Sequence, residues 1–464
     1  MTKKYDVLII GGGPSGCFSA YKINELKPLA KVLVLEMGKS LKDRKCPERE
    51  LGKCVKCKIC AVTHGSSGAG AFSDAKLLLP NKEDRVVRGN LGRHMTLKVA
   101  RELYAYTDRV YLELGATSKV WGEDGAEFLR RLAPDLAQAG LKANCSRIRH
   151  LGTDGARKIY QNMEDHLVSH GVEIRFDTEV TDLIVRDGTV KGVTTSNGKV
   201  LADKVVLAIG RAGTQWLEKM CKKHDISSYT GPADIGVRYE LPDSVMAEIN
   251  ENLYEGKFIG RPAPFRDKVR TFCQNPSGVV SAESYDGEYT LVNGHSYQNP
   301  MSETTNMAIL ASMLDGIQNP TEYALKIASI LNALGIGQPL VQRYGDLKEG
   351  HRTTREKLER NSVEATLKSA IPGDISLGLP HRVVMDILGF IDQMDIIVPG
   401  FAGEDNLLYA PEIKLYSRML KLSKNCETTV KGLYGIGDGA GPTHGLMPAS
   451  VNGVFLGSYL ASII

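Results

Sequence analysis

The N-terminal part of the chain carries the pattern that most narrows the folds open to it. A short apolar run at 5–10 leads directly into a GxGxxG motif at 11–16, and residues of helical character follow. A second apolar run at 31–35 ends in Glu36, 20 residues beyond the last glycine of the motif. The order of strand, glycine turn, helix, strand and acid predicts a βαβ unit that binds a dinucleotide.

Each part of this unit has a physical task in holding a pyrophosphate. Gly11 allows the tight turn, Gly13 lets the backbone approach the phosphates, and Gly16 lets helix and strand pack closely. The start of the helix offers N–H groups and a positive dipole. Glu36 is placed to accept from ribose hydroxyls, and its charge would repel a 2′-phosphate, so FAD or NAD is favoured over NADP. The expected cofactor contacts are Gly11, Gly12, Gly13, Pro14, Ser15, Gly16, Glu36 and Met37.

A second motif, near the C-terminus, indicates which dinucleotide binds. Residues 433–438 form a short apolar run that ends in Gly-Asp, and a helix-like stretch covers about 448–464. With this order of motifs the chain resembles the superfamily of FAD-dependent oxidoreductases built like glutathione reductase. The resemblance implies that Asp438 holds the ribityl chain of FAD and that the last helix points its N-terminus at the flavin. The matching residues are Gly437, Asp438, Met447, Pro448 and Ala449.

Two segments in the middle of the chain agree with this resemblance. Residues 171–180 resemble a strand whose end lies beside the adenine of FAD. Residues 205–210 resemble the strand that leads to an Ala-Thr-Gly turn, with Ile in place of Thr. The residues implied at the cofactor are Val180, Ala208, Ile209 and Gly210.

The spread of these motifs predicts a discontinuous cofactor domain in an α/β chain. A Rossmann-like FAD-binding domain with a β-meander between 171 and 210 is expected to carry an inserted mixed α+β cap, or substrate, domain. The cofactor domain is expected to comprise residues 1–80, 148–215 and 425–464. The cap is expected to comprise 81–147 and 216–424. Within the cap, we expect helices at 94–115 and 325–334 and strands between 234 and 295, with turn pairs at 286–287 and 293–294.

A narrower resemblance starts from the Cys-rich segment 46–60 and the Gly-rich segment 65–74. Together with 269–276 and 292–296, they resemble a group of FAD-dependent dehydrogenases whose substrates are largely unassigned. The resemblance implies an FAD-dependent oxidoreductase, a reductase or dehydrogenase, acting on a small organic molecule. The Gly-rich segment is flexible enough to lie against the flavin ring, and its expected contacts are Gly68, Gly70, Ala71, Phe72 and Ser73.

Four side chains are candidates for catalysis. His444 lies between the Gly-Asp motif and the last helix, which makes it the first choice for a proton donor at the flavin. Asp74 ends the Gly-rich segment, and helix capping is the alternative for Asp74 and for Ser73. His295 and, more weakly, Arg270 come from the cap, where a structural role is the alternative.

Four of the nine cysteines crowd into one short segment: Cys46, Cys54, Cys57 and Cys60. Thiolates at this spacing suit a tetrahedral Zn site or an iron–sulfur cluster. A redox dithiol of Cys54 and Cys57, or thiols without a ligand, are the alternatives. A cluster would let electrons enter here, whereas Zn would act as a scaffold. The other five cysteines are scattered, which favours a reducing compartment, by default the cytoplasm.

Charge and motif content limit the partners. Lys and Arg total 58 and Asp and Glu total 54, so the net charge is small and nucleic acid is not expected as a partner. No apolar run reaches the ~20 residues that a membrane span needs. The chain lacks a second GxGxxG unit in its middle, so NAD(P)H would have to dock transiently, or ferredoxin would supply the electrons. A flavin-dependent RNA-modifying enzyme and an electron-transfer or redox-sensing flavoprotein are the alternative functions.

Overall fold

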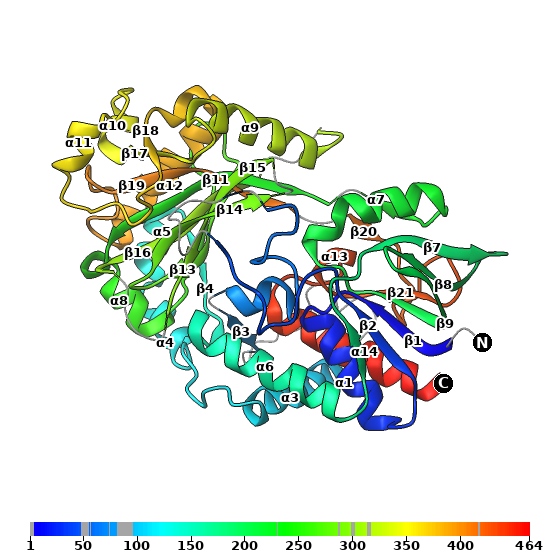
Figure 1. Ribbon diagram of the computed structural model, residues 1–464. Coiled ribbons are helices and arrows are strands. Elements are labelled where there is room, and N and C mark those ends of the chain that lie inside the picture. Colours follow the sequence, from blue (N-terminus) through cyan, green and yellow to red (C-terminus); the bar gives the residue numbers. More distant parts are fainter. Residues whose placement is uncertain are drawn as a thin grey trace.

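Two large sheets in two parts of the molecule organise the fold (Figure 1). The computed structural model describes residues 4–47, 55, 57–73, 75–80, 96–229, 231–285, 288–297, 302–312, 317–415 and 418–464. Within these described residues, three two-stranded sheets accompany the two large sheets. They pair β3 (Lys76–Leu79) with β5 (Arg147–His150), β10 (Ser228–Tyr229) with β20 (Met419–Leu420), and β14 (Val279–Tyr285) with β15 (Tyr289–His295).

The first large sheet is mostly parallel. Its strands are β1 (Lys4–Ile10), β2 (Val32–Leu35), β6 (Glu173–Arg175), β7 (Val180–Arg186), β8 (Thr189–Thr195), β9 (Gly198–Leu207) and β21 (Leu433–Gly435). Their order is β6-β2-β1-β9-β8-β7, and β21 also pairs with β9. The strands β1, β2, β6, β9 and β21 run parallel, whereas β7, β8 and the start of β9 form an antiparallel meander.

The parallel strands are buried on both faces, which explains their unbroken apolar sequences. In β1, Val7 and Ile9 pack into one apolar cluster, and Leu8 and Ile10 pack into another. The first cluster includes residues of several helices. These helices are α1 (Pro14–Leu26), α3 (Leu97–Glu113), α6 (Thr153–Ser169) and α14 (Leu446–Ile463).

The helices α1 and α14 run side by side, so the two ends of the chain meet (Figure 1). A Cβ at Gly453 would lie 2.3 Å from the carbonyl oxygen of Ser15, and one at Gly457 would lie 2.8 Å from that of Ser19. Only glycine allows backbones to approach this closely. By length and composition alone, α14 is apolar enough to cross a membrane, but 61% of it is buried inside the protein.

The second large sheet carries the rest of the described core. Its strands, in spatial order, are β18 (Ile371–Pro372), β17 (Leu340–Arg343), β19 (Leu407–Leu415), β11 (Ala233–Pro242), β16 (Thr304–Ser312), β13 (Lys268–Asn275), β12 (Lys257–Gly260) and β4 (Lys142–Asn144). The accompanying helices are α4 (Gly125–Arg131), α5 (Ala133–Ala139), α8 (Asp243–Leu253), α9 (Pro320–Leu334), α10 (Tyr344–Lys348), α11 (Arg355–Glu359) and α12 (His381–Ile397).

The two faces of this sheet differ in chemistry. Along β11, Ile235, Val237 and Tyr239 point into an apolar core shared with α12. The alternate residues Arg238 and Glu240 are buried on the other face, in hydrogen-bond networks. Neighbouring residues of a strand point to opposite faces. One face of the sheet therefore lies on the large apolar core, and the other, called the polar face below, buries these polar networks beside a smaller apolar cluster that includes Val341, Leu407 and Tyr409.

The structure confirms the α/β fold class and corrects two local predictions. Residues 171–180 are not one strand, because β6 ends at Arg175, Asp177 has a φ of 48°, and Val180 begins β7. The pair at 293–294 is not a turn, because it lies inside β15. A Cβ at Gly294 would lie 2.2 Å from Oδ1 of Asn306, so close packing explains this glycine. The predicted domain boundaries stay a prediction.

A buried carboxyl group in the second part should make stability depend on pH. Asp386 of α12 is fully buried, and burial, together with Asp267, raises the pKa of Asp386 to about 7. An exposed Asp in the unfolded chain titrates near pH 4. The folded state therefore holds this proton more tightly, and its stabilising contribution is present below about pH 4 and lost as pH rises through about 7. Asp386→Asn, neutral at every pH, should gain a few kcal/mol relative to wild type between pH 4 and 8 in urea unfolding. An equal pH dependence in both proteins would contradict this assignment.

Candidate functional site

The first glycine turn has the geometry that a dinucleotide site needs. Gly11 has a φ of +104°, and a Cβ there would lie 2.3 Å from the carbonyl oxygen of Ala208. A Cβ at Gly16 would lie 2.1 Å from the carbonyl oxygen of Gly11. At Gly13, by contrast, a Cβ would meet no atom of the described chain within 4 Å, and the φ of −75° suits any residue. Gly11 and Gly16 therefore serve the fold, and Gly13 borders open space at the start of α1.

Glu36 ties this turn to the Gly-rich segment. Its carboxylate is 5% exposed, and Oε2 accepts from the backbone N–H of Gly12 at 2.8 Å. Its other oxygen, Oε1, accepts from the N–H groups of Gly38 and Gly65, each at 2.9 Å. A carboxylate has about four acceptor positions, so these bonds leave room for about one more, such as the expected ribose hydroxyl. Met37, beside it, is half-buried.

The Gly-rich segment lies between the starts of α1 and α14. Here η1 (Gly68–Phe72) is a short 3-10 helix, and a Cβ at Gly68 would lie 3.3 Å from Cα of Gly13. A Cβ at Gly70 would lie 2.8 Å from Cδ2 of Leu446 and 3.3 Å from Cγ of Pro14. The segment therefore covers the first glycine turn and the beginning of the last helix.

Not every residue predicted here faces a ligand. Ala71 and Phe72 are buried in the apolar core. The hydroxyl of Ser73 donates to the carbonyl of Gly70 at 3.0 Å and accepts from the N–H of Ala75 at 3.2 Å, which favours the capping alternative. Asp74 lies outside the described residues. Ser67, which the sequence did not single out, is 1% exposed, and its Oγ has no hydrogen-bond partner in the described part of the chain.

Arg44 fixes the shape of this segment. Its guanidinium donates to the carbonyls of Ala61 and Val62 at 2.9 Å, Gly68 at 2.8 Å, and Ser66. It also lies 4.5 Å from the centre of the Phe72 ring. The side chain is 1% exposed, and burial lowers the pKa of Arg44 to about 10. Sequence reasoning missed this residue because a single arginine in a basic stretch carries no signal of four distant carbonyls.

The C-terminal turn joins the same place from the other side. It contains α13 (Gly437–Ala440), and a Cβ at Gly437 would lie 2.5 Å from Oγ of Ser15. A Cβ at Gly439 would lie 2.2 Å from the carbonyl oxygen of Gly210. Three of the predicted segments, 11–16, 208–210 and 437–441, therefore pack together. The fourth is linked through Glu36, whose carbonyl accepts from the N–H of Thr178 at 3.0 Å, two residues before Val180.

Asp438 organises the approach to the last helix. Its carboxylate accepts from the hydroxyl of Thr443 at 2.7 Å and from the N–H of Gly445 at 2.9 Å, and burial raises the pKa of Asp438. Gly445 then precedes α14, whose first turn has neither a capping side chain nor an acidic residue. Met447 and Ala449 are buried, and Pro448 is half-buried. These bonds hold the 443–445 loop at the start of α14.

His444 stands in this loop among positive charges. Burial lowers the pKa of His444 to about 4, and Lys414, Arg211 and Arg270 lower it further. The imidazole is therefore neutral at pH 7. His295, the other predicted histidine, ends β15 on the separate β14–β15 hairpin.

The predicted cysteine site is only partly within the described residues. Cys46, Cys57 and Cys60 are of intermediate exposure, and Cys54 lies outside the described residues. Within the described part, no group of three or more His, Cys, Asp or Glu side chains is placed to hold a metal ion. Zinc, an iron–sulfur cluster and free thiols stay open as interpretations of this segment.

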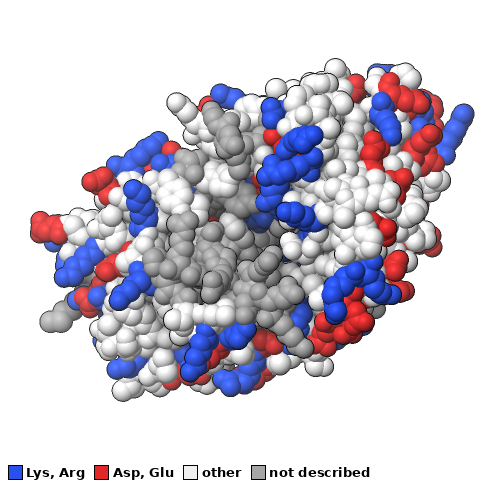
Figure 2. Space-filling model, turned by 180° about the vertical axis from the view of Figure 1, so that it is seen from behind, with Lys and Arg blue, Asp and Glu red and all other residues white. Residues whose placement is uncertain are grey.

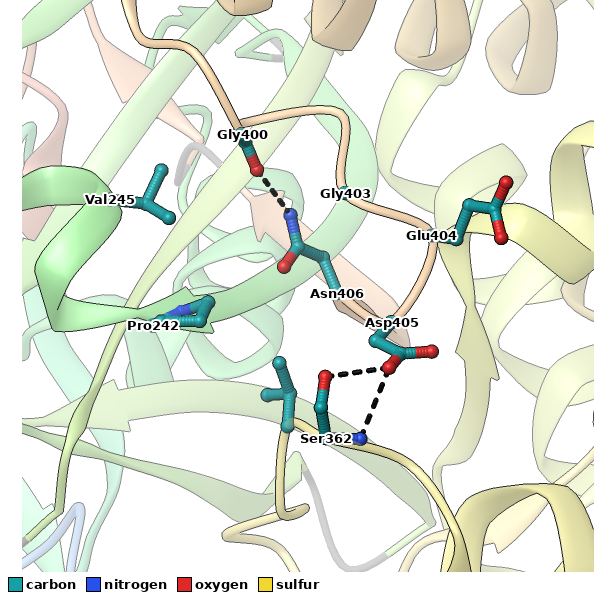
Figure 3. Close-up of a pocket in the computed structure, with 9 residues that line it drawn as sticks. Pro242, Val245, Ser362, Gly400, Gly403, Glu404, Asp405 and Asn406 are labelled. Carbon is teal, nitrogen blue, oxygen red and sulfur yellow. Dashed lines mark hydrogen bonds between the residues drawn. The ribbon is translucent and has the colours of Figure 1, made fainter.

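A pocket elsewhere does not bring these candidates together. It measures about 360 Å³ and is lined by residues such as Pro242, Ser362 and Asp405 (Figure 3). Asp405 accepts from the hydroxyl of Ser362 at 2.6 Å, and Asn406 donates to the carbonyl of Gly400 at 3.1 Å. Since these polar groups bond to one another, the pocket offers no argument for a ligand.

Comparisons with known proteins give a distant relative. No family model matches the chain. An uncharacterized protein of Clostridium beijerinckii is 24% identical over 481 residues, covering 98% of this chain and 80% of the relative.

Several solved structures are weakly similar. The quinol fumarate reductase of E. coli has a TM-score of 0.43 and 13% identity, covering 100% of this chain and 70% of that chain. Glycine oxidase of Bacillus cereus has a TM-score of 0.40 and 13% identity, covering 99% and 96%. L-proline dehydrogenase of P. horikoshii has a TM-score of 0.41 and 11% identity, covering 99% and 93%. At these scores, function has to be argued from the geometry of this chain.

The bonds of Arg44 predict its contribution to the site. Arg44→Met should leave four carbonyls without their donor and destabilise the protein by about 2–4 kcal/mol in urea unfolding. Amide hydrogen exchange should quicken at 61–68. Lys45→Met, at the exposed neighbouring position, should change neither quantity. Unchanged exchange at 61–68 in Arg44→Met would show that Arg44 does not hold the segment.

Proposed function

We propose that the chain is an FAD-dependent oxidoreductase, a reductase or dehydrogenase, that acts on a small organic molecule at the flavin. The observation that carries this proposal is the convergence of two glycine turns with the starts of α1 and α14. A parallel sheet places such turns at the carboxyl ends of its strands, where dinucleotides bind. Here these ends belong to β1, β9 and β21.

The residues present fit FAD. Backbone at Gly13 borders open space, and α1 starts with neither a capping side chain nor an acid in its first turn. Its N–H groups are thus suited to a pyrophosphate. The same holds for α14 and the flavin pyrimidine. The buried hydroxyl of Ser67, without a partner in the described structure, adds a polar group beside the turn.

Bound FAD would supply hydride or electron transfer, and the residues of the chain would bind and orient it. Glu36 would accept from the adenosine ribose with its remaining lone pair, and Asp438 would bond the ribityl chain. Arg44 keeps the Gly-rich segment over the turn. The neutral imidazole of His444 would donate a hydrogen bond from one ring nitrogen to the substrate and would accept a proton from it on the other.

The electron donor belongs to the same proposal. Without a second GxGxxG unit, either NAD(P)H docks transiently beside the flavin or ferredoxin delivers electrons. If Cys46, Cys54, Cys57 and Cys60 hold an iron–sulfur cluster, this segment is the entry point, and if they hold Zn, it is a scaffold. Scattered cysteines elsewhere support a reducing, cytoplasmic location. Anaerobic mixing with NADH, NADPH or reduced ferredoxin, followed by flavin absorbance, distinguishes the donors.

The substitution Gly13→Ala tests cofactor binding directly. Because the added methyl group meets no atom of the described residues within 4 Å, the apo protein should unfold at the same urea concentration as wild type. The methyl would however occupy the space where the backbone meets the pyrophosphate, so bound FAD should fall to about a tenth or less. Released flavin is measured by absorbance after denaturation. Full flavin content in the variant, or a wild-type protein that never takes up FAD, would refute the proposal.

His444→Ala tests the proposed proton transfer. FAD should stay bound, whereas flavin turnover with the active donor should fall by about 100-fold or more. His351→Ala, at an exposed position beside Glu349, is the matched control and should leave turnover within about twofold of wild type. Equal turnover in wild type and His444→Ala would remove His444 from the mechanism.

A further inference from the structure

A group of positive side chains gathers around His444. Among the described residues, the charged groups that most affect His444 are three cations, Lys414, Arg211 and Arg270, and one carboxylate, Asp234. They come from four separate segments of the chain. Arg211 starts η3 (Arg211–Gly213), directly after the turn at Gly210. These four residues and His444 are called the cationic cluster below.

The register of the second sheet explains why the charges meet. Asp234 of β11 lies opposite Lys414 of β19 and opposite Ser312 of β16. Arg270, on β13, donates to Oδ2 of Asp234 at 2.6 Å. These side chains share the polar face of the sheet. The first part of the protein contributes Arg211 and His444 from the loops after β9 and β21, so the cluster spans both parts.

An aromatic ring holds two of the cations close together. The Nζ atom of Lys414 lies 3.4 Å from the centre of the Phe272 ring, and the guanidinium carbon of Arg270 lies 4.8 Å from it. Cation–π attraction offsets part of the repulsion between them. Burial, Arg270 and Arg211 nevertheless lower the pKa of Lys414 to about 7.

The neighbouring carboxylates are already engaged. Asp234 accepts from Arg270 and, at 2.7 Å, from the hydroxyl of Ser312. Asp438 accepts from Thr443 and Gly445. Asp234 holds the guanidinium of Arg270 in place. Among the described residues, the charges that most affect His444 are three cations and one carboxylate. An added anion would therefore be attracted most strongly at or below about pH 7, where Lys414 is protonated.

We propose that the substrate carries a carboxylate and that Arg211, Arg270 and Lys414 bind it beside His444. This rests on the proposed flavin site, because His444 lies in the loop that leads to α14 and to the flavin end of that site. Asp234 is a positioning residue, which holds Arg270 in place through the ion pair. A carboxylate suits this geometry, since guanidinium groups bind it with paired, charge-assisted hydrogen bonds. The substrate class is therefore a small organic acid.

The same cations would also attract the negative charge of a reduced flavin. The substrate carboxylate and the reduced flavin are both anions, but they are present at different stages of the reaction. A substrate carboxylate binds to the protein with oxidised flavin, whereas the flavin anion appears only after reduction. Binding to the oxidised holoprotein therefore distinguishes the two sources, and we commit to the carboxylate.

The experiment compares acids with their uncharged amides. Oxidised holoprotein, its flavin content measured first, is titrated calorimetrically with succinate, glutarate and benzoate and with succinamide, glutaramide and benzamide. At least one acid should bind about tenfold or more tightly than its amide. If no acid does so, the proposal is overturned, whether or not flavin is bound. A preparation without flavin would count against the proposed function separately, since calorimetry needs no flavin signal.

Variants locate the binding site. Lys414→Met and Arg270→Lys should each weaken binding of the preferred acid, the first by about tenfold or more and the second by less, because a lysine keeps the charge and can still pair with Asp234. Lys326→Met, at an exposed position on α9, should leave binding unchanged. If Lys414→Met shifts the flavin reduction potential but leaves the acid-to-amide ratio unchanged, the cations serve the flavin and the proposal fails.

Discussion

Close packing between α1 and α14 is the constraint on which the candidate site depends. Gly453 and Gly457 let the last helix lie against the backbone of the first at Ser15 and Ser19. A side chain at either glycine would force the helices apart, and the Gly437 turn would lose its contact with Ser15. Two helix starts, far apart in the sequence, thus come to one place. Their dipoles and N–H groups can act on one extended ligand only because of this contact.

The polar face of the second sheet buries charged side chains as hydrogen-bonded ion pairs. Arg238 is fully buried and donates to Glu412 at 3.0 and 3.1 Å and to the carbonyl of Cys273 at 2.9 Å. Burial raises the pKa of Glu412, while Arg238 opposes that shift. A buried pair of this kind adds little net stability, because desolvation offsets the attraction. The pair joins β11 to β19 where their register shifts, between Gly236 and Arg238. Across the surface seen in Figure 2, by contrast, Lys, Arg, Asp and Glu are interspersed.

The sequence predicted those parts of the structure in which residues close together in the chain determine the geometry. The glycine turn at 11–16 was recognisable because strand, turn and helix follow one another directly. Residues 171–180 read as one strand because apolar spacing does not reveal the left-handed Asp177. Arg44 and the cationic cluster could not be found, since their partners are brought together by sheet register and long connections. Ser73 was ambiguous from sequence, because capping and ligand binding use the same hydroxyl.

The position of the cationic cluster follows from the same rule that positions the glycine turns. Arg211 comes after β9 and His444 after β21, so both stand beyond the carboxyl ends of parallel strands, at the edge where Gly11 follows β1. A ligand at that edge meets the first part of the protein on one side. The polar face of the second sheet supplies Arg270 and Lys414. A charged group between the two parts would therefore meet Arg211 on one side and Arg270 and Lys414 on the other. This two-sided arrangement would link the charge of the proposed substrate to the fold, because both parts of the protein supply cations.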